Sequence, residues 1–136
     1  MWVLTVYIFL KLPSTIPTHF NFSGQVDDYG NKHSFLILPI LATIIYFGLT
    51  QLSKYPQIFN YLTKITDENA SKQYTDSTRL LRFLKVIIVL TFSLIILFTY
   101  LTTIGVTNGL GSWFLPMMFG LFLIPTIISI TQSLKK

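Results

Sequence analysis

The feature that most limits how this chain can fold is an uncharged run near its C-terminus. Residues 86–134 contain no Asp, Glu, Lys, Arg or His. An apolar segment of about 20 residues is long enough to cross the hydrocarbon core of a bilayer, and a water-soluble core cannot absorb so long a run. Composition agrees, because only 11% of the residues are charged, against about 25% in soluble domains. The sequence predicts an integral membrane protein.

Four apolar segments predict an all-α membrane domain over residues 1–136, with about four transmembrane helices. The first, residues 1–11, is short: its apolar part gives about 14 Å of helix, whereas the hydrocarbon core is about 30 Å thick. We expect it to continue upstream of residue 1, or to be completed by tilt, local thinning of the bilayer or a partner chain. The other three segments are residues 35–52, 86–103 and 113–131.

The connections between these segments differ in character. Residues 12–34 are rich in Pro and Gly, which predicts a compact non-helical loop with a short hairpin. Residues 53–85 form a polar connection that becomes a helix. Thr66 resembles an N-cap followed by two acids, and nothing from there to Thr103 is Gly or Pro, so one helix of about 55 Å is expected. The amphipathic stretch 58–65 fits either the membrane surface or packing against that helix.

Basic residues predict the orientation in the membrane. The net charge is +5, and its placement beside apolar segments is typical of topology signals rather than of a nucleic-acid interface. The positive-inside rule places the 53–85 connection and the C-terminus in the cytoplasm, and the 12–34 loop outside with the turn at 105–112. The basic residues concerned are Lys54, Lys64, Lys72, Arg79, Arg82, Lys85, Lys135 and Lys136.

Several function classes are disfavoured by what the sequence lacks. It has no Cys, which excludes disulfides, thiol catalysis and cysteine metal sites. The three long apolar segments contain no ionisable side chain apart from tyrosine, whereas ion and proton pathways usually place such groups within the membrane. A transporter or channel is therefore the least favoured class.

The outer loop carries the most specific motif. Its sequence LPSTIPTHFNFSGQVDDYGNK, over residues 12–32, resembles the signature of the DUF1648 family of bacterial membrane proteins, with about a dozen matching positions. An apolar helix entered through Pro39 follows, as in that family. The resemblance covers roughly residues 10–50. It implies a multi-pass protein of the bacterial cytoplasmic membrane, without a cofactor.

The same resemblance suggests a function and partners. The family includes SdpI-like proteins, which protect bacteria from a secreted toxic peptide and signal its presence. A non-enzymatic role in toxin-peptide immunity or sensing is therefore implied. Membrane lipids, the toxic peptide and a regulator protein are the expected partners, no nucleic acid is expected, and a homo-oligomer is compatible with the sequence.

Side-chain chemistry divides the loop into two groups. Proline and glycine control backbone shape, so four structural positions are expected to fold the loop, with left-handed backbone at the two glycines. They are Pro13, Pro17, Gly24 and Gly30. Asp27 is expected to cap a turn as well. The candidate ligand-binding residues offer hydrogen bonds, stacking and charge: His19, Phe20, Asn21, Asp27 and Lys32.

The alternative is a metal-dependent membrane enzyme using His19 with Asp27 and Asp28. These side chains and His33 supply nitrogen and oxygen ligands, but their spacing matches no standard metal motif. His19 as a general base oriented by Asp27 is a further form of this hypothesis. Catalysis generally needs several tuned groups in one cleft, so the non-enzymatic interpretation is preferred and the question of enzymatic activity stays open.

Overall fold

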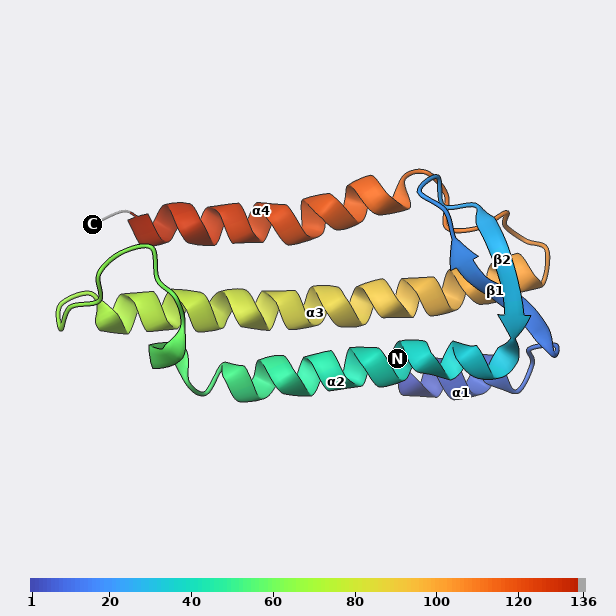
Figure 1. The fold of residues 1–136 in the computed structure, drawn as a ribbon, viewed down its shortest axis with the longest axis horizontal. Coiled ribbons are helices and arrows are strands. Elements are labelled where there is room, and N and C mark those ends of the chain that lie inside the picture. Colours follow the sequence, from blue (N-terminus) through green and yellow to red (C-terminus); the bar gives the residue numbers. More distant parts are fainter. Residues whose placement is uncertain (135–136) are drawn as a thin grey trace.

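A computed structural model describes residues 1–134 of the chain as a helical bundle closed at one end by a β-hairpin (Figure 1). α3 (Ala70–Thr103) lies in the middle, with α2 (Ile37–Leu52) on one side and α4 (Phe114–Leu134) on the other. The short α1 (Trp2–Phe9) precedes them. The prediction of a mostly helical membrane protein with about four helices and a non-helical loop after the first is confirmed. Lys135 and Lys136, used in the orientation argument, lie outside the described residues.

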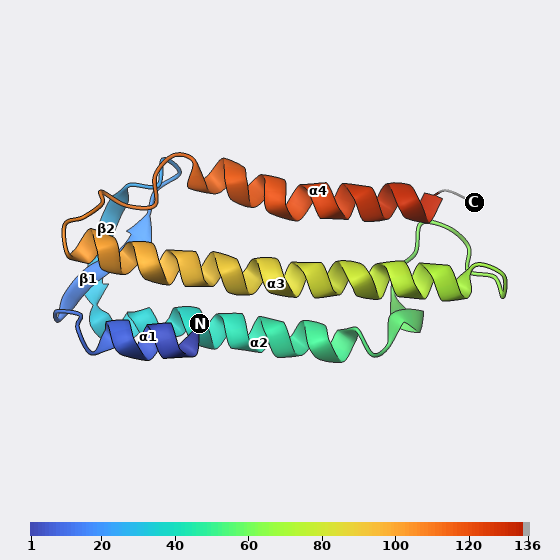
Figure 2. The same cartoon turned by 180° about the vertical axis from the view of Figure 1, so that it is seen from behind.

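Three of the described helices are long and apolar enough to cross a membrane. Their spans are Lys32–Leu52, Ala70–Thr103 and Phe114–Leu134. The eight-residue α1 is as short as its sequence suggested and lies beside the hairpin-proximal half of α2 (Figure 2). The Trp2 indole N–H donates a hydrogen bond to Thr43 Oγ1 at 2.9 Å, which fixes α1 against α2.

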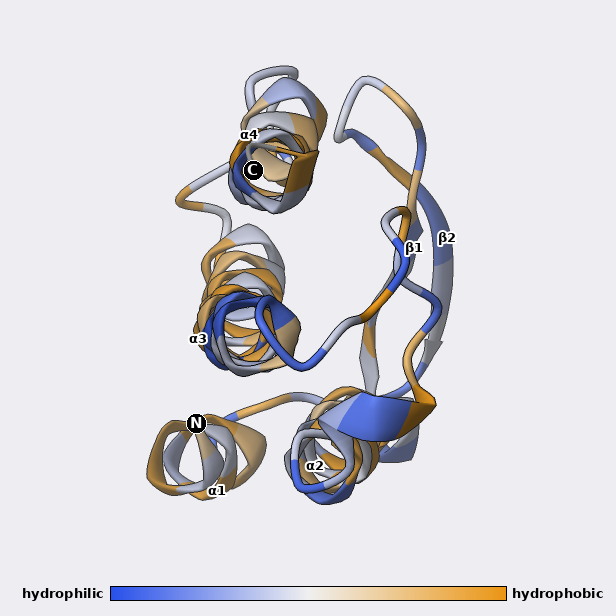
Figure 3. Cartoon of the chain, turned by 90° about the vertical axis from the view of Figure 1, so that its left-hand side faces the viewer, coloured by the Kyte–Doolittle hydropathy of each residue, from blue (hydrophilic) through white to orange (hydrophobic). Residues whose placement is uncertain are grey.

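The 12–34 loop contains the expected hairpin. β1 (Thr15–Phe20) pairs antiparallel with β2 (Val26–Asn31), and a short 3-10 helix, η1 (Lys32–Leu36), leads into α2. Asn31 caps this turn by accepting the His33 N–H at 2.9 Å. Viewed along the helices, the hairpin extends from α2 across α3 to α4 (Figure 3). It therefore ties together one end of the bundle.

α3 is one continuous helix, as predicted, but its predicted start is wrong. Helix begins at Ala70, with Asn69 as N-cap, rather than just after Thr66. The Thr66 N–H donates to Asn69 Oδ1 and the Asn69 N–H to the Thr66 carbonyl, at 2.9 and 3.1 Å. These bonds close a separate turn over the two acids, so the helix starts after it.

The connection between α2 and α3 packs against α3. After a short 3-10 helix, η2 (Pro56–Ile58), it is irregular until the turn before α3. The Tyr61 hydroxyl shares a 2.9 Å hydrogen bond with Ser77 Oγ, and its ring centroid lies 5.8 Å from that of Tyr74. Of the two alternatives for this amphipathic stretch, the structure supports packing on the long helix.

Fully buried apolar side chains concentrate at the hairpin end. One cluster joins α1, β1, η1 and α3, and comprises Ile8, Leu12, Ile16, Phe35 and Ile96. A second joins the start of α4 to the preceding turn, and comprises Leu110, Phe114 and Met118. Elsewhere most of the large apolar side chains of α2 and α4 are exposed, as expected for a surface that contacts lipid. The buried clusters give the hairpin a fixed base.

Candidate functional site

A histidine–aspartate pair lies on the exposed side of the hairpin. His19 Nδ1 and Asp27 Oδ1 are 2.5 Å apart, and the two side chains are 67% and 42% exposed. The register is irregular on both strands here: Thr18 is left unpaired between Pro17 and His19, and Asp27 is left unpaired because His19 pairs with Asp28 and Phe20 with Val26. This irregularity brings the carboxylate to the imidazole.

Two hollows flank this pair. The larger, about 340 Å³, lies between the hairpin and the helices, and Pro17, Phe35, Leu38 and Ile95 are among its lining residues. The smaller, about 280 Å³, lies toward α4 and includes Asp27, Phe22 and Phe114. His19 and Phe20 line both. An imidazole and a carboxylate thus stand at the rim of largely apolar hollows, an arrangement suited to a ligand with both polar and apolar parts.

Asn21, not Asp27, caps the hairpin turn. Asn21 Oδ1 accepts hydrogen bonds from the Ser23 and Gln25 N–H groups at 2.9 and 3.0 Å. The expectation that Asp27 caps a turn is wrong, since its carboxylate is engaged by His19. Asn21 stands immediately before the turn, from where an amide oxygen reaches the N–H groups that follow. One candidate ligand-binding side chain therefore has a structural hydrogen-bonding role.

The hairpin tip is joined to the turn before α4 by backbone contacts. The Gly24 carbonyl accepts the Leu110 N–H at 2.7 Å, and Gln25 pairs with Gly109 as an isolated bridge. Gly24 has φ +72°, as expected, and an added Cβ would collide with the Gly111 backbone. The sequence identifies the 105–112 segment only as a turn. The close spacing of its glycines is the sequence feature that could have predicted a close approach of another backbone segment.

Gly30 was expected to adopt left-handed backbone, and this is wrong. It lies within β2, and positive φ is found instead at Gly24, Gly105, Gly109 and Gly111 among the described residues. Its need for glycine comes from space, because an added Cβ would lie 2.9 Å from Thr18 Cγ2 on the facing strand. Cross-strand crowding, rather than turn geometry, restricts this position.

The remaining candidate residues lie away from the pair. Lys32 follows β2, and its Nζ lies 5.0 Å from the Phe9 ring centroid on α1. His33 Nδ1 is 2.6 Å from Asn31 Oδ1. Pro17 is buried in β1, whereas Pro13 is exposed before it. The structure therefore brings His19, Phe20, Asn21 and Asp27 together near the tip, and places Lys32 at the base of the hairpin.

The proposed metal ligands do not converge. Asp28 Oδ1 accepts the Tyr29 N–H at 2.9 Å, and His33 is turned toward α1, where its ring meets Phe9 edge-on. Within residues 1–134 there is no group of three or more His, Cys, Asp or Glu side chains that could hold a metal ion. His19 and Asp27 alone form a pair.

Two exposed aromatic residues of the hairpin escaped the sequence analysis. Phe22 at the tip is 93% exposed and Tyr29 on β2 is 62% exposed. In addition, β2 lies on the outer side of β1 (Figure 3), and in the part of the chain that is described no further strand of the sheet pairs with it. The alternation of polar and aromatic residues around Phe22 is the sequence feature that could have predicted an exposed aromatic side chain there.

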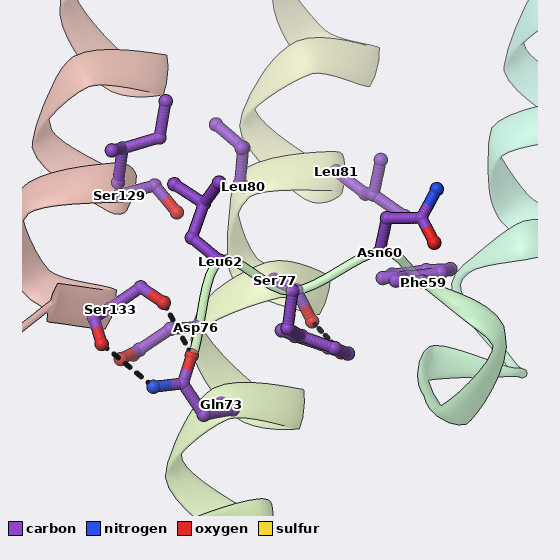
Figure 4. Close-up of a pocket in the computed structure, with 12 residues that line it drawn as sticks. Phe59, Asn60, Leu62, Gln73, Asp76, Ser77, Leu80, Leu81, Ser129 and Ser133 are labelled. Carbon is purple, nitrogen blue, oxygen red and sulfur yellow. Dashed lines mark hydrogen bonds between the residues drawn. The ribbon is translucent and has the colours of Figure 1, made fainter. Parts of the chain in front are cut away.

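A different hollow lies at the opposite end of the bundle. Residues of the 53–69 connection, α3 and α4 surround about 220 Å³ (Figure 4). Gln73 is 4% exposed there; its Nε2 donates to the Ser133 carbonyl at 2.8 Å, and its Oε1 accepts from Ser133 Oγ at 2.6 Å. This end is joined by side-chain hydrogen bonds.

Comparison with known proteins shows that the hairpin end is similar to a family. Residues 1–43 match the family described as "Domain of unknown function (DUF1648)", which covers α1, the hairpin and the start of α2. An uncharacterized protein of Archaeoglobus fulgidus is 32% identical over 68 residues, which span 44% of this chain and 37% of that relative. No solved structure matches the chain. The family resemblance drawn from the loop motif is confirmed.

Proposed function

We propose that this membrane protein binds a peptide at its hairpin end, without catalysing a reaction, and acts in toxin-peptide immunity or sensing as SdpI-like proteins do. The observation that carries the proposal is the exposed His19–Asp27 pair at the rim of an apolar hollow. The family match at residues 1–43 covers the hairpin and its His19–Asp27 pair, while residues of α3, α4 and the turn between them complete the hollows.

The hairpin has the features that extended peptides use for binding. A peptide adds a strand to an open sheet edge through main-chain hydrogen bonds, while alternate side chains enter neighbouring pockets. The outer edge of β2 offers such an edge, and most of its residues are exposed. The hollow beside Phe20 accepts an apolar side chain, and the His19–Asp27 pair supplies hydrogen bonds at its rim.

The proposal includes a location. The hairpin lies outside the bacterial cytoplasmic membrane, with the basic 53–85 connection on the cytoplasmic side, as the positive-inside rule requires. A secreted peptide then reaches the hairpin without crossing the membrane. A regulator protein, lipids and further copies of the chain are the other partners expected in this arrangement.

One observation favours a second candidate function. A carboxylate 2.5 Å from an imidazole nitrogen is also the geometry of a histidine base held in orientation by an acid. A membrane enzyme using this pair would act on a substrate held in the adjacent hollow. Such an enzyme would lose activity when the imidazole is removed, as a receptor would lose binding, so the test must measure both.

The test uses cells that express the protein and are challenged with a panel of secreted membrane-active peptides. We expect wild-type protein to raise survival against at least one peptide, and His19→Ala to weaken protection about tenfold, since a charge-assisted hydrogen bond contributes about 1.5 to 3 kcal/mol. Thr15→Ala is the matched control, because Thr15 is exposed at the other end of β1. Immunoblots of membranes establish equal protein levels.

Three outcomes decide the matter. Equal protection by wild type and His19→Ala would contradict the proposal, as would the absence of protection across the panel. Loss of the protein itself in His19→Ala would show a structural histidine. Disappearance of intact peptide from the medium, measured by mass spectrometry and dependent on His19, would favour the enzyme instead.

A further inference from the structure

A groove lies along the contact between α3 and α4 at the end opposite the hairpin, and we call it the seam groove. Its volume is about 320 Å³. Asp76, Arg79 and Gln132 line it together with the apolar Phe83, Pro125 and Ile128. It is distant from the hairpin site, and nothing in the proposed function uses it.

The carboxylate of Asp76 is the unusual group in this groove. Its side chain is 15% exposed, and it is the single acid of α3. Within the described chain, the one cation within ion-pair distance is Arg79, whose Nη1 lies 3.8 Å from Asp76 Oδ1, beyond hydrogen-bonding range. An ionised carboxylate accepts about four hydrogen bonds, and shielding it from water without donors is costly. The position therefore suits a ligand that brings N–H donors.

The guanidinium of Arg79 is available for a second interaction. Its side chain is 60% exposed, and it carries five N–H donors in a geometry that matches phosphate. Because Asp76 and Arg79 are three residues apart on one helix, a negative and a positive group stand next to each other at the same end of the groove. Their complement is a ligand with an ammonium and a phosphate close together.

The depth of this charged pair corresponds to the headgroup layer. Lys85 Nζ donates to Thr50 Oγ1 at 3.1 Å in the last turns of α2, which marks the edge of the apolar spans. Arg79 lies six residues farther from the hairpin, about 9 Å along the helix. The headgroup region adds about 5 to 8 Å on each side of the hydrocarbon core. Arg79 thus lies at the outer limit of the headgroup layer, and Gln132, which lines the same groove, lies in the last turn of α4.

The lining of the groove also becomes apolar toward the bilayer. Phe83 lies one turn toward the bilayer from Arg79, and Pro125 lies about two turns toward it from Gln132. Phe83 and Ile128 are 56% and 49% exposed. A lipid whose headgroup meets the charged pair would therefore lay an acyl chain along these side chains.

We propose that the seam groove binds a phospholipid with a phosphoethanolamine headgroup. The primary ammonium donates to the Asp76 carboxylate, Arg79 binds the phosphodiester, and an acyl chain packs on Phe83, Pro125 and Ile128. Phosphatidylglycerol offers only neutral hydroxyl donors to the carboxylate, without the charge pairing that an ammonium supplies, and its net negative charge is repelled by Asp76. A trimethylammonium headgroup has no N–H to donate. The chemistry therefore selects phosphatidylethanolamine over phosphatidylglycerol and phosphatidylcholine.

The experiment is native mass spectrometry of the purified full-length protein in detergent with equimolar phosphatidylethanolamine, phosphatidylglycerol and phosphatidylcholine of identical acyl chains. We expect wild-type protein to retain phosphatidylethanolamine about five- to tenfold more than either competitor. Asp76→Asn should abolish this preference, and Arg79→Gln should weaken retention of all three lipids. Arg82→Gln is the control, since Arg82 is exposed on the same helix and does not line the groove.

Other results would overturn the assignment. Preferential retention of phosphatidylglycerol by wild type, or stronger retention after Asp76→Asn, would show a site for anionic lipid. Equal retention of all three lipids would show an unselective apolar surface. Circular dichroism of each variant checks that helix content is unchanged; if Asp76→Asn fails this check, Arg79→Gln and wild type still decide between these outcomes.

Discussion

The two ends of this bundle are held together by different kinds of contact. At the hairpin end, the Gly24 carbonyl accepts the Leu110 N–H, and Gln25 pairs with Gly109, so backbone meets backbone. At the opposite end, Gln73 bonds Ser133 and Tyr61 bonds Ser77 through side chains. The hairpin end also contains both buried apolar clusters.

This difference bears on where side chains are free to serve recognition. Backbone contacts depend on the absence of a Cβ at a few glycines and leave the neighbouring side chains unused. Phe22, Ser23 and Gln25 at the tip are accordingly exposed. At the opposite end, the polar side chains themselves join the helices. A rigid tip with uncommitted side chains is the better base for a recognition surface.

The two ends of the bundle are expected to differ most in their exposure to the two sides of the membrane. The chain has no native Cys, so Gln25→Cys and Glu68→Cys introduce single thiols at exposed positions at the two ends. A membrane-impermeant maleimide should label Gln25→Cys in intact cells and Glu68→Cys only after permeabilisation. The reverse pattern would invert the orientation, and labelling of both in intact cells would mean that the ends share a side.

Replacing Gly24 with Ala should destabilise the hairpin end. The left-handed backbone and the collision with Gly111 together cost on the order of 1 to 3 kcal/mol. Gly48→Ala is the matched control, because an added Cβ there meets nothing within 4 Å and Ala favours helix. Thermal unfolding in detergent should show a lower midpoint for Gly24→Ala alone. Equal midpoints for the two variants would remove the argument for a backbone-held tip.

The smallest effect is expected at the opposite end. Gln73→Leu removes both bonds to Ser133, and hydrogen bonds between membrane helices contribute about 0.6 kcal/mol each on average. Ser133→Ala removes one of the two, since the Ser133 carbonyl stays. Unfolding in a mild denaturant, with the double variant to close the cycle, measures the coupling. If Gln73→Leu lowered the stability of the protein more than Gly24→Ala does, the contacts at the opposite end would contribute more to stability than those at the hairpin end.

The sequence by itself determined the features that depend on neighbouring residues. Hydropathy over about 20 residues located the long helices, and the absence of Gly and Pro predicted that α3 is unbroken. Turn residues in the 12–34 loop predicted the hairpin. Where two adjacent caps competed, as at Thr66 and Asn69, the sequence was not sufficient, because the outcome depends on which side chain reaches which N–H.

Only the tertiary structure decided the contacts between distant residues. Gly24 meets Gly111 because α2 carries the chain away from the hairpin and α3 returns it, so the lengths of these two helices set that meeting. Asp27 meets His19 where the hairpin register shifts on both strands, and a one-residue shift reverses the facing of a side chain along a strand. Asp76 lies beside Ser129 because α4 packs along α3. Local pattern carries no information about such packing, so the sequence named the side chains of the hairpin site, whereas their geometry and the seam groove were visible only in the folded chain.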